Sequence, residues 1–154
     1  MQRRDFRLST FIFQFGVMGR IIAIDYGRVR TGLAVTDPMR IIATALSTVE
    51  TPTLLQYLKD YCAREEVDEF VVGEARRMDG SPSESMQYIE PFVERLKALF
   101  PDKKVSRIDE RFTSKMAFQT MIDSGLRKKQ RRDKGMIDQI AATIMLQDYM
   151  KQNT

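Results

Sequence analysis

Three apolar segments of β type follow one another near the start of the chain, separated only by short turns. They cover residues 20–26, 31–37 and 41–49, and Gly27 and Pro38 mark the turns. Two parallel strands need a crossover of about a dozen residues or more, which these turns cannot supply. The sequence therefore predicts three neighbouring antiparallel strands.

The pattern then changes to an alternation of helices and short strands. The expected elements are a helix from Thr51-Pro52, a strand over 69–73, a helix from Ser81 to Phe100, a strand over 104–109, a helix from Thr113 to Gly125 and a helix from Ile137 to Met150. Thr51 is expected to cap its helix, and the run Ser81-Pro82-Ser83-Glu84 has the form of a capping box. The order predicts an α/β fold: a mixed five-stranded sheet, three antiparallel strands then parallel ones, flanked by helices.

The length of 154 residues fits one domain. Residues 18–154 are expected to form it, and residues 1–17 are expected to be a disordered N-terminal extension. That extension carries arginines and a short apolar run, but no cleavage site of small residues follows it. No apolar stretch approaches the roughly 18 residues that a membrane-spanning helix needs, so no membrane partner is expected.

The chain contains no histidine and a single cysteine, Cys62. This composition excludes Ser-His-Asp hydrolysis, Cys-His chemistry, histidine-based nucleases, intrachain disulfides and cysteine-based zinc sites. Cys62 is interpreted as a core thiol on a helix, in keeping with a reducing cytoplasm. Carboxylates, lysines, arginines, hydroxyls and bound hard metal ions remain for catalysis.

Acidic side chains stand at the ends of three predicted elements. Asp25 closes the first strand, Asp109-Glu110 closes the last strand, and Asp138 opens the final helix. Hydrolysis of phosphodiesters without histidine usually needs metal ions, often two about 4 Å apart, which stabilise the attacking and leaving oxygens. Mg²⁺ or Mn²⁺ takes oxygen ligands, so these acids are candidates for a two-metal site.

Each acid also has a purely structural interpretation. Asp25 can be a turn residue, although the following Gly27 lets a ligand approach the backbone closely. Asp138 can simply complement the helix dipole. Asp109 and Glu110 are neighbours, so we expect one to face the site while the other pairs with a nearby arginine.

Positive charge is concentrated in residues 127–134, which carry six bases and one acid. Such a segment is typical of a nucleic-acid contact, and equally of a solvated surface loop. The basic residues proposed to contact nucleic acid are Arg28, Arg30, Arg111, Arg127, Lys128, Lys129, Arg131, Arg132 and Lys134.

Four ordered motifs resemble the YqgF (RuvX) family. They are Asp25-Tyr26-Gly27-Arg28-Val29-Arg30-Thr31-Gly32, then Phe70-Val71-Val72-Gly73 with Met78-Asp79-Gly80, then Asp109-Glu110-Arg111-Phe112-Thr113-Ser114, and Lys134-Gly135-Met136-Ile137-Asp138. The resemblance covers residues 18 to about 150. It implies a ribonuclease-H-like fold related to Holliday-junction resolvases, and a metal-dependent nuclease that matures the 5′ end of pre-16S rRNA in ribosome biogenesis.

The resemblance also implies that Asp25, Glu110 and Asp138 hold the metal ions, and that Gly27 and Gly73 are backbone positions of the site. The chain departs from the family after Gly73, where Glu74-Ala75 replaces the usual Leu-Pro. Glu74 is therefore a further candidate ligand, as is Asp109; the alternative is that Glu74 pairs with a neighbouring arginine.

The expected partners are structured RNA, with branched DNA as the second choice, and ribosomal precursor particles. Two other functions stay open on the sequence: a junction-resolving DNA endonuclease, and a non-catalytic RNA-binding module of the same fold.

Overall fold

The computed structural model describes residues 19–115, 118–119, 121–122 and 134–153. Residues 1–17, predicted to be an extension, lie outside these ranges. Residues 127–133 of the basic segment lie outside them as well.

Five strands form one mixed sheet in the order β3-β2-β1-β4-β5. The strands are β1 (Arg20–Asp25), β2 (Arg30–Thr36), β3 (Ala43–Glu50), β4 (Val67–Glu74) and β5 (Lys104–Asp109). The first three pair antiparallel, and β4 and β5 continue the sheet in parallel from β1. The predicted mixed five-stranded sheet is confirmed.

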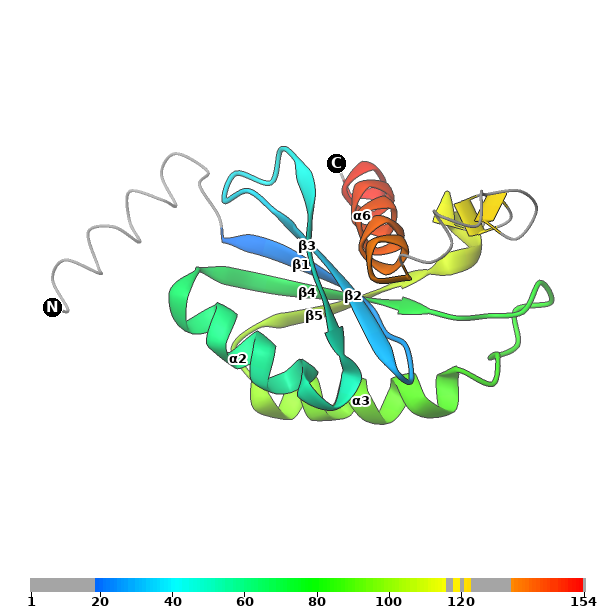
Figure 1. The fold of residues 1–154 in the computed structure, drawn as a ribbon, viewed down its shortest axis with the longest axis horizontal. Helices are drawn as coiled ribbons and strands as arrows, with labels where there is room; N and C mark the ends of the chain where they lie inside the picture. Colours follow the sequence, from blue (N-terminus) through cyan, green and yellow to red (C-terminus); the bar gives the residue numbers. More distant parts are fainter. Residues whose placement is uncertain (1–18, 116–117, 120, 123–133, 154) are drawn as a thin grey trace, which may run out of the picture.

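Helices cover both faces of this sheet (Figure 1). The helical elements are η1 (Thr51–Thr53), α2 (Leu54–Arg64), α3 (Met86–Leu99), η2 (Glu110–Phe112) and α6 (Lys134–Gln152). Alternate residues of β1 are buried on opposite faces: Ile22 and Ile24 pack with α2 and α3, whereas Ile21 and Ala23 pack with α6. Burial on both faces is why this strand is a continuous apolar run rather than an alternating one.

The carboxyl ends of β1, β4 and β5 meet at one edge of the sheet because these strands are parallel. Glu74 stands beside Asp109 in the register of β4 and β5, and Asp25 stands beside Gly32 of β2. A Cβ atom on Gly32 would overlap the carbonyl oxygen of Asp138. The glycine therefore lets α6 approach β2 closely, next to the strand that ends in Asp25.

Two predicted helix caps are wrong. Thr51 caps no helix; its hydroxyl donates to the carbonyl oxygen of Gly27, and α2 begins three residues later. The capping box at residues 81–84 does not form either, and α3 begins at Met86 without a side-chain cap. Pro82 instead forms a β-bridge with Arg76, and the Ser83 amide donates to a carbonyl of the loop after β4. Tertiary pairing outweighs the local signal in both cases.

The prediction that Asp138 opens the final helix is also wrong. Lys134, Gly135 and Met136 are already helical, so Asp138 lies beyond the first turn of α6, which holds no acidic residue. The apolar periodicity begins only at Ile137, because the preceding turn is largely solvated. The helix dipole therefore does not explain an acid at this position.

Within the described ranges, no helix combines the length and the apolar character needed to cross a bilayer.

Candidate active site

Two of the predicted carboxylates converge on one buried ammonium group. Lys115 Nζ donates to Asp25 Oδ1 over 2.6 Å and to Glu110 Oε1 over 2.9 Å. Each of the three side chains is less than a fifth exposed. Asp25 at the end of β1 and Glu110 in η2 therefore face the same point at the carboxyl edge of the sheet.

Local backbone structure holds Glu110 and Lys115 in this arrangement. The Thr113 hydroxyl donates to the carbonyl oxygen of Glu110 over 2.9 Å, and the Lys115 amide donates to the same hydroxyl over 3.3 Å. Thr113 thus links Glu110 and Lys115 through its hydroxyl, while most of the helix predicted from Thr113 to Gly125 lies outside the described residues. On β4, a Cβ atom at Gly73 would lie 2.5 Å from Glu110 Oε1. The missing side chain of Gly73 gives Glu110 its space beside the sheet.

The charge of Lys115 is fixed by this pairing. Burial acts to lower the pKa of Lys115, but the carboxylates of Asp25 and Glu110 outweigh it and raise that pKa above its usual value. The two carboxylates therefore favour the charged form of Lys115.

Asp138, the third predicted carboxylate, is held separately. Its Oδ2 accepts from Arg30 Nε over 3.0 Å. Its backbone lies against Gly32, which pairs with Asp25 across β1 and β2. Asp138 therefore stands at the same edge of the sheet. Among the described residues, however, no three side chains of the metal-binding types gather into one group.

The two further candidate ligands are both paired with arginines. Arg111 binds both oxygens of Asp109 through Nε and Nη2, and this hydrogen bonding lowers the pKa of that carboxyl. Arg76 Nη2 donates to Glu74 Oε2 over 2.8 Å. Glu74 thus pairs with a neighbouring arginine, which was the alternative to its being a metal ligand. The prediction that one of Asp109 and Glu110 pairs with a nearby arginine is confirmed.

The predicted nucleic-acid residues divide into held and solvated side chains. Arg30 and Arg111 are engaged by carboxylates. The exposed Arg28 stacks on Tyr88 with 4.2 Å between its guanidinium carbon and the ring centroid, and Lys134 is exposed at the start of α6. The remaining candidates fall outside the described residues: Arg127, Lys128, Lys129, Arg131 and Arg132.

The turn between β1 and β2 requires a glycine at position 27. A Cβ atom there would overlap the carbonyl oxygen of Arg30. The group that approaches Gly27 closely in this structure is the backbone of Arg30.

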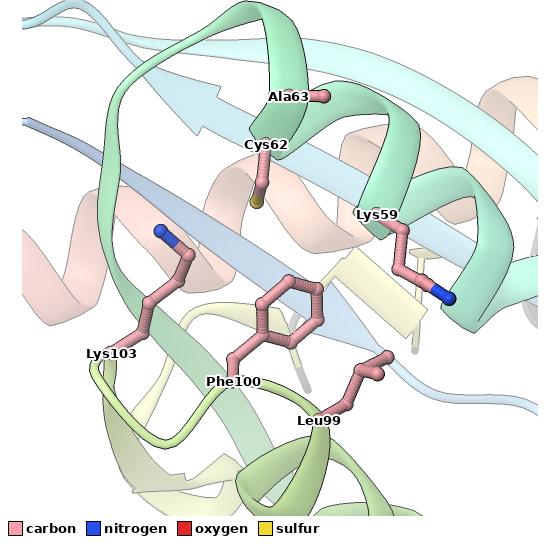
Figure 2. A pocket seen from close by; sticks show the side chains of 6 residues that line it. All are labelled: Lys59, Cys62, Ala63, Leu99, Phe100 and Lys103. Atoms are coloured by element: carbon pink, nitrogen blue, oxygen red, sulfur yellow. The ribbon is translucent and has the colours of Figure 1, made fainter.

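A separate surface pocket lies at the opposite edge of the sheet, where α2 and α3 end and β4 and β5 begin (Figure 2). Its lining residues are Lys59, Cys62, Ala63, Leu99, Phe100 and Lys103. Cys62 is half-buried, and its burial raises the pKa of the thiol, so it stays protonated. This agrees with a packing role on α2 and places the thiol away from the carboxylates.

Comparison with known proteins extends the assignment from the site to the family. The model of the RuvX family, described as Holliday junction resolvase, matches residues 19–152. The chain belongs to the RuvX family.

The RuvX relatives share most of their length with this chain. A protein of Flavobacterium johnsoniae named "Putative pre-16S rRNA nuclease" is 61% identical over 133 residues, which are 86% of this chain and 96% of the relative. Proteins of the same name from Flavobacterium psychrophilum and Porphyromonas gingivalis are 56% and 54% identical, over 86% of this chain and 97% and 96% of their own. The predicted family and its ribonuclease-H-like fold are confirmed.

Reasoning from the sequence missed two residues that shape this candidate site. Gly32 interrupts a predicted strand, which is a signal of close backbone approach that could have been used. Lys115 carries no comparable signal. It lies five residues after Glu110 in a predicted helix, and only the turn through Thr113 brings its ammonium back to that side chain.

Proposed function

We propose that this RuvX protein is a divalent-metal-dependent nuclease that processes the 5′ end of pre-16S rRNA in the cytoplasm. Family membership makes the chain a hydrolase of phosphodiester bonds. The observation that carries the proposal for the site is the convergence of Asp25 and Glu110 on a single cation position. The names of the relatives support RNA as the substrate.

The donor set at this point fits a hard metal ion. Asp25 and Glu110 present carboxylate oxygens to a cation, and Mg²⁺ and Mn²⁺ prefer such ligands. We propose that these two side chains hold the metal and that Asp138 joins them from α6 in a two-metal site. When bound, the metal supplies activation of the attacking water and stabilisation of the leaving oxygen.

The chain's own residues prepare the site. Gly73 and Thr113 fix the position of Glu110, and Arg30 fixes the orientation of Asp138. Lys115 compensates the two facing carboxylates when no metal is bound. We propose that Arg28, Lys134 and the basic segment bind the phosphate backbone, since such contacts provide affinity but little sequence discrimination.

The family description favours one second candidate, a nuclease that resolves branched DNA. A junction resolvase needs two active sites presented symmetrically, so it requires two copies of this chain. The remaining alternative is a non-catalytic RNA-binding module.

One assay separates these functions. The purified full chain is incubated with a 5′-extended small-subunit rRNA precursor or with a four-way DNA junction, in Mg²⁺, in Mn²⁺ or in EDTA. We expect the 5′ end of the RNA to be shortened only with a metal ion, and the junction to persist. Cleavage of the junction alone would favour the resolvase, and RNA binding without cleavage of either substrate would favour the binding module.

The two glutamates at the carboxyl edge form a matched pair of variants. Glu110→Gln is expected to lose cleavage, because an amide is a weaker metal ligand than a carboxylate. Glu74→Gln is expected to stay largely active, because Glu74 is bound to Arg76 in a separate ion pair. Cleavage rates of both variants at saturating Mg²⁺ test this expectation. An active Glu110→Gln with an inactive Glu74→Gln would identify Glu74 on β4 as the metal ligand in place of Glu110.

A further inference from the structure

An exposed aromatic ring lies two residues from the proposed catalytic Glu110. Phe112 is 68% exposed. Every other aromatic residue in the described ranges is buried or half-buried. Single exposed apolar side chains are common on protein surfaces, so exposure alone assigns no role to Phe112. Its fixed position and its neighbours do.

Two hydrogen bonds hold the backbone that carries the ring. Asp109 Oδ1 accepts from the Arg111 amide over 3.0 Å at the start of η2. The Phe112 carbonyl accepts from Gln152 Nε2 of α6 over 3.0 Å. The ring is thus presented to solvent from a well-supported turn.

A guanidinium group accompanies this ring and links it to the loop after β4. The guanidinium carbon of Arg111 lies 5.0 Å from the ring centroid of Phe112, while Asp109 binds the same guanidinium. Arg111 Nη1 also donates over 3.4 Å to the carbonyl of Met78, a residue that is 78% exposed. Met78 belongs to the loop after β4, and Figure 1 shows that loop leaving the sheet on the same side as the segment after β5.

We propose that Phe112 is a stacking platform for an unpaired nucleobase next to the bond that is cleaved. A nucleobase matches the flat exposed ring, because bases stack on exposed aromatic side chains in sites for single-stranded nucleic acid. Both faces of a base inside a duplex are covered by its neighbours, so only an unpaired base can use the platform. The site therefore takes single-stranded nucleic acid at the point of cleavage. This inference rests on the proposed nuclease function and adds the class of substrate.

The chain contains no tryptophan, which provides a direct test. Phe112→Trp introduces the only indole of the protein, and a base stacked on it quenches its fluorescence. The variant is titrated with a single-stranded RNA oligonucleotide and with the same sequence in a duplex, in EDTA so that the RNA stays intact. We expect strong quenching by the single strand and little by the duplex.

Met39→Trp is the matched control. Met39 is 57% exposed in the turn between β2 and β3, at the sheet edge opposite Asp25. The fluorescence of the Met39→Trp variant is expected to stay unchanged with the single-stranded RNA and with the duplex. In anisotropy measurements with labelled single-stranded RNA, Phe112→Ala is expected to bind at least about fivefold more weakly, and Phe112→Tyr is expected to bind like the native protein.

The outcomes separate this inference from the function on which it rests. Unchanged fluorescence of Phe112→Trp on single strands that bind by anisotropy would overturn the platform alone. So would equal quenching by the duplex, or native binding by Phe112→Ala. If the native protein neither binds nor cleaves any RNA or DNA, the nuclease function fails together with the platform.

Discussion

Asp25→Asn is expected to reduce cleavage by at least about a hundredfold while the fold stays intact. The substitution keeps the shape of the side chain and its hydrogen bond to Lys115, but it removes one of the two charges that converge there. Asp138→Asn is expected to have the same effect, through the ligand proposed to come from α6. Single-turnover cleavage at several Mg²⁺ concentrations measures both variants, and circular dichroism verifies the fold.

The control for both variants is Asp60→Asn on α2. Asp60 is exposed and accepts from Gln56 one turn earlier, so this variant makes the same change of charge on a solvated surface. It is expected to cleave at the native rate. A near-native rate for Asp138→Asn would mean that Asp138 only pairs with Arg30, and a near-native rate for Asp25→Asn would remove the central ligand from the proposed site.

Reasoning from the sequence located the elements of the sheet because their signals are local and repeated. β5 was predicted with its observed bounds, Lys104–Asp109, between Pro101-Asp102 and Glu110. The antiparallel start followed from the shortness of the turns. Helix starts were less predictable, because the hydrogen bonds of Thr51 and Ser83 go to distant loops that no local pattern reveals.

The candidate site could be predicted only in part. Element ends identified Asp25 and Glu110, because parallel strands bring their carboxyl ends to one edge. The basic residues that pair with those acids could not be predicted, because their side-chain directions are set by the turns that follow the strands. The turn through Thr113 aims Lys115 at both acids, and Arg30 reaches Asp138 across 108 positions of sequence. No spacing rule covers such contacts.

Lys115→Met is expected to destabilise the metal-free protein by about 3 kcal/mol, or roughly 6–12 °C in Tm. Methionine preserves much of the length and apolar stem of lysine, but it leaves Asp25 and Glu110 facing each other without a compensating charge. Thermal unfolding in EDTA measures the loss. Lys97→Met is the control: Lys97 is about half exposed in a pair with Glu94 on α3, and its substitution is expected to change Tm little.

The contact of Lys115 with Asp25 and Glu110 also affects how the protein responds to metal ions. An ammonium group and a divalent cation cannot occupy the same position between two carboxylates, so metal binding to the native protein has to displace Lys115. Lys115→Met has nothing to displace and gains charge compensation when Mg²⁺ or Mn²⁺ binds. We therefore expect either ion to raise the Tm of this variant more than that of the native protein, and calorimetry to show tighter binding. Equal shifts in both proteins would place the metal away from Asp25 and Glu110, because only a metal bound between them competes with the lysine.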